Sequence, residues 1–195
     1  MRSKTISATL LLVSVLLAQQ PNPTCRHCSA SYIPKSELDA YIQRAIEHRL
    51  IDQQVRSIDV GKSQVGIGIV RRGRLTGTNP EAETVAEHEQ ISEVYYIIDG
   101  SATLLTGPDL VEPKKRPDNL KTVREQNGPG YNARSIAHPM ITELKPGDMI
   151  VIPAGTGHWF TKIDDHITYA MVRIDPDKVV PTKNETQSRD YLKNR

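Results

Sequence analysis

The sequence predicts an all-β fold, a small β-barrel preceded by one helix. Two stretches carry this prediction, because residues 87–100 and residues 146–160 each combine an apolar run with tight turns. Apolar runs bounded by glycine, proline and aspartate are typical of strands. At 195 residues the chain is long enough for one domain with a proper core. Folded together, the two stretches would bring His88, Glu93 and His158 around one point inside the barrel.

Residues 1–20 have the pattern of a signal peptide. Arg2 and Lys4 precede an apolar run over residues 10–18, which has the length of a signal-peptide core and is too short for a membrane span. We therefore expect a secreted or periplasmic protein, although a buried N-terminal helix would share this pattern. Removing the segment takes away two of 25 basic and none of 23 acidic residues, leaving 23 of each. Such a balance gives no long-range attraction to nucleic acid or anionic lipid, so neither nucleic acid nor a membrane is expected as a partner.

Cys25 and Cys28 are the only cysteines and lie just after the predicted cleavage region. In an exported chain they are expected to form a local disulfide. With His27 between them they would supply at most half of a zinc site. A redox-active pair is the other alternative, but no thioredoxin-like βαβ pattern surrounds them.

An N-terminal extension, residues 21–54, is expected to contain an amphipathic helix over residues 37–50. Ser36 is the expected N-cap, and apolar residues then follow at helical spacing. These apolar residues are Leu38, Ile42, Ala45, Ile46 and Leu50. The helix is expected to pack on the barrel or on a second subunit.

The barrel is expected over residues 55–176. Residues 58–60 and 65–70 have the pattern of two short strands, and positions 84, 86 and 88 share one strand face, as do 93, 95 and 97. Asp99 and Gly100 predict a two-residue hairpin turn in which both residues have positive φ, so that residues 101–106 return antiparallel. Residues 141–144 and 149–152 continue the strands. Residues 158–163 and 166–174 are expected to form a final pair about a turn at Asp164 and Asp165.

Residues 107–137 show no sustained period and predict a long arm between the two stretches. Such connections are usually a lid, an interface arm or a surface excursion. Residues 177–195 are expected to form a polar tail. Arg71, Arg72 and Arg74 follow one strand, and they are either solvated charges or part of an anion-binding rim.

The two stretches resemble the two sequence motifs of the cupin family, over roughly residues 60–176. The matching positions are His88, Glu93 and Gly100 in the first motif and Gly147, Pro153, Gly155 and His158 in the second. The resemblance implies a double-stranded β-helix, or jelly-roll, barrel. It also implies that His88, Glu93 and His158 are metal ligands.

Three positions depart from the cupin pattern. Ala86 stands where the first motif has its first histidine, Pro80 where it has its leading glycine, and Lys162 where the second motif has its closing asparagine. Ala86 removes one of the four protein ligands that cupin metal sites usually supply. The resemblance therefore implies the fold in full and the metal chemistry in part.

Two imidazoles and one carboxylate suit a divalent transition metal, namely Fe, Mn, Ni, Zn or Cu, and leave coordination positions open for substrate. His88, Glu93 and His158 would supply that set. Tyr95 lies on the same strand face as Glu93, so it is a candidate fourth ligand, a candidate catalytic acid, or a residue that lines the pocket. His138, carried by the arm, is a second candidate for the fourth ligand.

Two functions follow from this pattern. The first is a metal-dependent enzyme for a small organic substrate, either an oxygenase or a lyase or isomerase in which Tyr95 or Glu93 moves a proton. The alternative is a non-catalytic cupin without metal, which binds a small ligand or serves as a structural dimer. A homodimer is expected in either case, because the helix at 37–50 and the arm at 107–137 offer more surface than one small barrel needs.

Overall fold

A computed structural model describes residues 24–25, 28–76 and 85–193 of the chain. The predicted signal peptide, His27 and Pro80 lie outside these residues. Within them, Cys25 and Cys28 are joined in a disulfide, as predicted. In the described part of the chain, no helix has the length and apolar character needed to cross a membrane.

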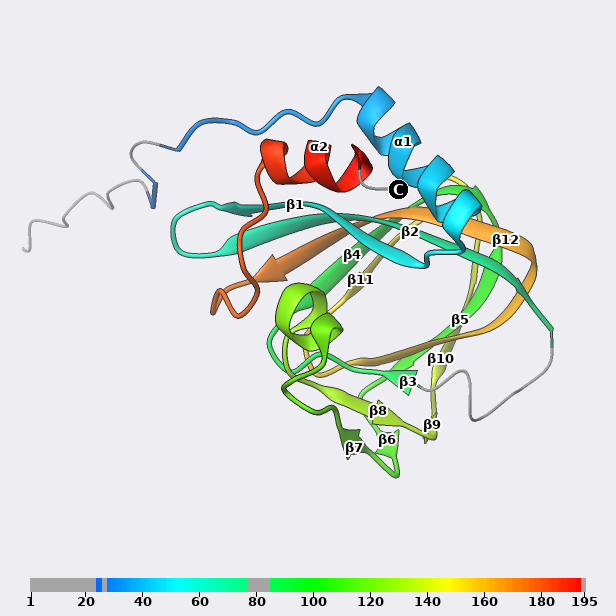
Figure 1. Cartoon of the computed structure of the whole chain (residues 1–195). Coiled ribbons are helices and arrows are strands. Elements are labelled where there is room, and N and C mark those ends of the chain that lie inside the picture. The colour runs from blue at the N-terminus through cyan, green and yellow to red at the C-terminus, as the bar shows by residue number, and fades with distance from the viewer. Residues whose placement is uncertain (1–23, 26–27, 77–84, 194–195) are drawn as a thin grey trace, which may run out of the picture.

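The described residues form an antiparallel β-barrel made of two facing sheets, with a helix near each end of the chain (Figure 1). This confirms the predicted all-β class with an N-terminal helix. The first sheet has the order β1 (Asp52–Asp59), β2 (Gln64–Leu75), β12 (Gly157–Asp175), β4 (Ser92–Gly100) and β11 (Met149–Ile152). The second has the order β10 (Met140–Leu144), β5 (Ala102–Gly107), β12, β3 (Val85–Ala86), β8 (Tyr131–Ala133) and β7 (Lys114–Lys115).

Strand β12 joins the two sheets. Residues 157–162 pair with β5 in the second sheet, and residues 163–175 pair with β2 in the first. The expected turn at Asp164 and Asp165 is therefore wrong. The strand runs on through a register shift between Ile163 and His166, and such shifts bend a strand. Two aspartates hold His166, with its Nε2 2.9 Å from Asp99 Oδ2 and its Nδ1 2.6 Å from Asp165 Oδ2.

The core fills the space between the sheets. On β4 the buried residues Glu93, Tyr95 and Ile97 face inward and alternate with more exposed ones, as the pattern predicts. On β12, Phe160 is buried in the same core. Trp159 instead packs on the outer side, against a second apolar cluster. These two adjacent aromatic residues thus lie on opposite faces of β12, since strand side chains alternate.

The hairpin predicted at Asp99 and Gly100 is wrong. Strand β5 does not pair with β4; it crosses to the second sheet, where it pairs with β10 and β12. Gly100 alone of the two residues has positive φ, at 77°. A Cβ on Gly100 would overlap the backbone oxygen of His166, so glycine is needed there because the chain turns directly against β12.

Helix α1 (Lys35–His48) begins two residues earlier than expected. Its N-cap residue is Pro34, without a side-chain capping bond, so Ser36 lies inside the helix and is not the cap. Tyr41 is fully buried and packs with Val55 and Ile69 of the first sheet. Strand β1 then starts at residue 52, inside the expected extension 21–54.

The arm over residues 107–137 has regular secondary structure. It contains four short strands and a π-helix, η1 (Val123–Asn127). The strands not yet named are β6 (Leu110–Val111) and β9 (Ser135–Ile136), which pair with each other. Backbone bonds in both directions join Glu87 and Tyr131 and hold the arm against β3. Long-range pairing of this kind leaves no periodic signal in the arm's own sequence.

The polar tail also forms structure, as helix α2 (Glu185–Lys193). Asn184 and Gln187 cap its start reciprocally, since each side-chain oxygen accepts the other's backbone N–H at 3.0 and 2.8 Å. Tyr191 stacks on Tyr41 at a ring-centroid distance of 5.5 Å, so α2 packs beside α1. Figure 1 shows both helices over β1 and β2 of the first sheet.

Candidate metal centre

Strand pairing brings the three predicted ligands together inside the barrel. His88 follows β3, Glu93 lies on β4 and His158 lies at the start of β12. Strand β12 pairs with both β3 and β4, so residues about 70 positions apart in sequence become neighbours. All three side chains are buried, with exposed fractions of 4, 2 and 8 %.

The separations of the candidate ligand atoms fit a single metal ion. His88 Nε2 lies 3.5 Å from Glu93 Oε1, and His158 Nε2 lies 3.6 Å from Glu93 Oε2. All three ligand atoms lie within 4.8 Å of one another. Two atoms bound to one metal at about 2.1 Å lie roughly 3.0 to 3.5 Å apart at tetrahedral or octahedral angles. Small side-chain adjustments would therefore bring the group into a metal's first shell.

The other predicted site residues divide into two kinds. Tyr95 reaches the site, where its hydroxyl donates to Glu93 Oε2 at 2.7 Å. His138 is exposed and takes no part in the group, so it does not supply a fourth ligand here. Ala86 lines the cavity and pairs in register with His158. The missing histidine of the cupin pattern thus leaves a small side chain facing the site.

Arg173 on β12 is a site residue that the sequence analysis missed. Its Nε donates to Glu93 Oε1 at 3.4 Å and its Nη1 donates to Gln54 Oε1 at 2.7 Å. It also forms an ion pair with Asp52. With an exposed fraction of 2 %, this guanidinium is a buried counter-charge for two carboxylates. Strand alternation from the inward Tyr169 would have placed Arg173 inside.

Arg116 is a second missed residue, and it comes from the arm. Its Nη2 donates to the Glu87 carbonyl oxygen at 2.6 Å and lies 3.2 Å from His88 Nδ1. Its Nη1 donates to the Tyr131 carbonyl oxygen at 2.8 Å. In the sequence, Arg116 ends a run of three basic residues that has the appearance of surface charge, so no local signal identifies it.

Burial and charge set the protonation of the group. Burial lowers the pKa of His88 to about 3 and also lowers the pKa of His158, in both cases against the opposing effect of Glu93. Burial raises the pKa of Glu93, but the two imidazoles, Arg173 and the Tyr95 hydroxyl outweigh it and lower that pKa to about 2. At neutral pH the site therefore holds neutral imidazoles and an ionised carboxylate, the forms that bind metals.

The cavity at the group is small, with a volume of about 70 Å³. Besides the three candidate ligands, it is lined by Arg72, Tyr169 and Met171 among others. The Arg72 guanidinium carbon lies 5.1 Å from the centre of the Phe160 ring. Of the three arginines considered for an anion-binding rim, only Arg72 lines this cavity. The volume of the cavity limits any molecule that binds there to a small one.

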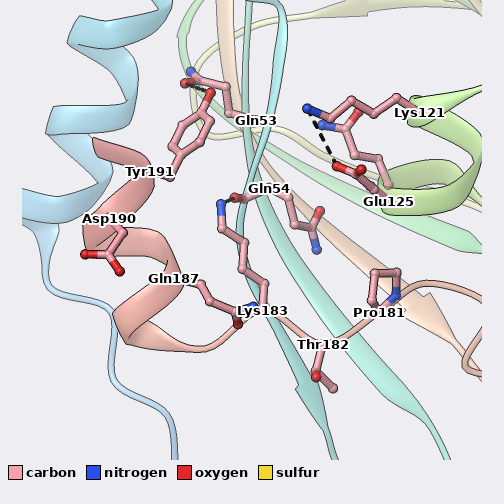
Figure 2. A pocket seen from close by; sticks show the side chains of 11 residues that line it. Gln53, Gln54, Lys121, Glu125, Pro181, Thr182, Lys183, Gln187, Asp190 and Tyr191 are labelled. Atoms are coloured by element: carbon pink, nitrogen blue, oxygen red, sulfur yellow. Dashed lines mark hydrogen bonds and ion pairs between the residues drawn. The ribbon is translucent and has the colours of Figure 1, made fainter. Parts of the chain in front are cut away.

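A larger pocket of about 660 Å³ lies elsewhere, between α2, β1 and η1 (Figure 2). Lys183 lies 4.4 Å from the Tyr191 ring centre and donates to the Tyr41 hydroxyl at 3.1 Å. Burial lowers the pKa of Lys183 to about 8. Gln54 lines this pocket and also accepts the bond from Arg173, so the pocket wall is connected to the candidate metal centre.

Comparison with solved structures finds distant matches at low identity. No family model matches the chain, and no curated protein matches its sequence. A protein from Bacillus halodurans is 13 % identical, with 84 % of this chain and 97 % of that chain covered and a TM-score of 0.42. A cupin protein from Bacteroides fragilis is 14 % identical, with 58 % of this chain and 68 % of that chain covered and a TM-score of 0.34. The DMSP lyase DddQ from Ruegeria pomeroyi is 17 % identical, with 68 % of this chain and 49 % of that chain covered and a TM-score of 0.37.

The strand arrangement of this chain identifies the fold. The first motif spans β3 and β4, and the second spans β11 and β12. The motif glycines Gly100, Gly147 and Gly155 have φ of 77°, 91° and 79°, which favour glycine at these turns. With both motifs meeting inside an antiparallel two-sheet barrel, the chain has the β-barrel fold that the two motifs predict.

Proposed function

We propose that this protein binds one divalent transition metal, Fe, Mn, Ni, Zn or Cu, through His88, Glu93 and His158. We further propose that it acts on a small organic substrate as an oxygenase, lyase or isomerase. The observation that supports this is the convergence of three buried ligand atoms within 4.8 Å of one another. Two imidazoles and one carboxylate leave coordination positions open for a substrate.

The bound metal would supply Lewis-acid activation of a substrate oxygen. The protein's own residues would orient the substrate and handle protons. Arg173 holds Glu93 through its Nε at 3.4 Å and so fixes the direction of the carboxylate. The Tyr95 hydroxyl is 2.7 Å from that carboxylate, and burial raises the pKa of Tyr95 well above its ordinary value. Tyr95 therefore keeps its proton at neutral pH and can act as a hydrogen-bond donor in the site.

A metal-free ligand-binding protein is the second candidate, and a specific observation favours it. Glu93 already has hydrogen-bond partners in Tyr95 and Arg173, so the carboxylate is satisfied without an ion. A divalent cation would also lie close to the positive charge of Arg173, which disfavours binding. In this function the same cavity would hold a small organic ligand through hydrogen bonds alone.

Elemental analysis of protein purified without chelator separates the two candidates. We expect about one transition-metal ion per chain. The control is His138→Ala, because His138 is an exposed histidine outside the group and its loss should leave the metal content unchanged. Protein that carries no metal and takes up none on incubation with Fe(II), Mn(II), Ni(II), Zn(II) or Cu(II) would support the metal-free candidate instead.

Export and dimerisation also remain proposals. The basic start and apolar run of residues 1–20 support export, and intact mass of protein from the native host should show a chain starting between residues 19 and 25.

Exposed apolar residues on β10 and β11 support a homodimer, because these strands carry Met140, Ile141, Met149 and Val151 at exposed fractions of 58 to 66 %. Light scattering at micromolar concentration should give twice the chain mass, and a monomer mass would contradict the dimer.

A further inference from the structure

The Nδ1 atoms of the two histidines in the candidate metal centre face different kinds of hydrogen-bond partner, one an acceptor and the other a donor. His158 Nδ1 lies 3.3 Å from the carbonyl oxygen of Thr156, which can only accept a hydrogen bond. His88 Nδ1 lies 3.2 Å from Nη2 of Arg116, and a guanidinium can only donate. The two imidazoles are therefore held in different tautomers.

The tautomer decides which ring nitrogen has a lone pair for a metal. His158 donates from Nδ1, so its Nε2, which faces Glu93, is unprotonated and ready to bind a metal. His88 accepts at Nδ1, so its ring proton is on Nε2, the atom 3.5 Å from Glu93 Oε1. In this tautomer His88 can donate to Glu93, but its Nε2 cannot coordinate an ion.

Arg116 is firmly placed to hold His88 in this state. Its exposed fraction is 8 %, and its guanidinium also donates to the carbonyl oxygens of Glu87 and Tyr131. Its backbone N–H donates to the Gly130 carbonyl oxygen at 2.9 Å. If the His88 proton moved to Nδ1, this N–H would point at an N–H of Arg116, and neither group could accept a hydrogen bond. The metal-binding tautomer therefore requires Arg116 to be displaced. Histidines that bind metals ordinarily donate from the other nitrogen to a carboxylate or carbonyl.

We propose that Arg116 sets the tautomer of His88, and that metal binding at this site is coupled to the release of Arg116 from His88. Arg116 is thus a positioning residue carried by the arm. With Arg116 in place, the site is a hydrogen-bonded group with one available imidazole lone pair, on His158. With Arg116 displaced, His88 gains an Nδ1 proton and the three-ligand set is complete. The coupling to metal rests on the proposed function, whereas the tautomer of His88 does not.

A matched pair of substitutions tests the proposal. Arg116→Gln introduces an amide oxygen that can accept the His88 Nδ1 proton, whereas Arg116→Lys keeps a side chain that can only donate. The first measurement is the tautomer of His88 in the metal-free protein, from ¹⁵N shifts of the imidazole nitrogens assigned with His88→Gln. We expect a protonated Nε2 in the wild type and in Arg116→Lys, and a protonated Nδ1 in Arg116→Gln. The His158 tautomer should be the same in all three, which also reports an intact site.

The second measurement is Zn(II) affinity by competition with a chromophoric chelator. We expect Arg116→Gln to bind Zn(II) about 10- to 100-fold more tightly than the wild type, the range seen when outer-shell partners of a metal ligand are changed. Arg116→Lys should stay close to the wild type. A wild-type His88 protonated on Nδ1 would overturn the proposal. Equal Zn(II) affinities in the two variants would overturn the coupling to metal.

The two measurements distinguish this proposal from the proposed function. If no variant binds Zn(II) or any of the other metals, the metal function fails, and with it the coupling. The imidazole shifts then still decide whether Arg116 sets the tautomer. A change of tautomer in Arg116→Gln alone would support that part, and an unchanged tautomer would refute it.

Discussion

Replacing His158 by alanine is expected to weaken metal binding by more than about 100-fold, beyond the range for changes to outer-shell partners. The reason is that His158 supplies the one imidazole Nε2 whose lone pair is already directed at the site, 3.6 Å from Glu93 Oε2. Titration of the purified variant with Fe(II), Mn(II), Ni(II) and Zn(II) measures the change.

Ala86→His is the opposing substitution for the same titration. Ala86 lines the cavity and pairs in register with His158, so a histidine there would restore the fourth ligand of the cupin pattern. We expect tighter binding than in the wild type. Identical affinities for the wild type and both variants would mean that these residues are not ligands. Loss of metal in His158→Ala without a gain in Ala86→His would show that Tyr95 or water already fills the fourth position.

Replacing Arg173 by methionine is expected to lower the free energy of unfolding by about 3 to 5 kcal/mol, the cost of removing one partner from a buried ion pair. The substitution leaves the carboxylates of Glu93 and Asp52 without their shared counter-charge. Urea denaturation at pH 7 measures the loss.

Arg71→Met is the matched control, because Arg71 lies on β2 with a partly exposed side chain and one hydrogen bond, to Thr168 Oγ1 at 2.8 Å. Its loss should cost about 1 kcal/mol. Equal losses in the two variants would show that Arg173 is not a buried counter-charge.

The loss in the free energy of unfolding caused by Arg173→Met should also depend on pH. In the wild type the folded-state pKa of Glu93 is lowered to about 2, so its contribution to stability is present above the unfolded pKa and is lost only as the pH falls towards 2. Without Arg173 the same carboxylate is buried with less compensation, and its folded-state pKa rises. Protonation of Glu93 in the folded variant then stabilises the folded state as the pH falls. The difference from the wild type should therefore shrink as the pH is lowered from 7 to 5, and a deficit that grows over this range would contradict this explanation.

Several features of the fold were predictable because they depend on local patterns. The alternation of Glu93, Tyr95 and Ile97 along β4 predicts which face is buried, since strand side chains alternate. Glycine at residues 100, 147 and 155 predicts turns because these positions take positive φ. The helical spacing from Leu38 onward predicts α1, although the helix starts at Lys35, two residues earlier than expected.

Features that depend on distant pairing were not predictable. The arm over residues 107–137 has no period of its own, yet it is ordered by bonds such as those between Glu87 and Tyr131. Strand β5 has the sequence of a returning hairpin strand, but it continues along β12 from the point where β4 ends, and so it pairs in the second sheet. These choices are made by the pairing of strands far apart in the chain, which no short window of sequence contains.

The sequence by itself determined the class of the fold and the three residues, His88, Glu93 and His158, that the structure brings together. Residue type and motif spacing carry that information, because only certain side chains suit a metal and because the positive φ of those turns favours glycine. Tertiary structure alone decided the surroundings of the three. It placed Arg173 beside Glu93 and Arg116 beside His88, contacts that join residues 80 and 28 positions apart. The hydrogen bonds and charges of a buried site come from whichever side chains the packed strands and arm bring within reach, so they are fixed only when the chain has folded.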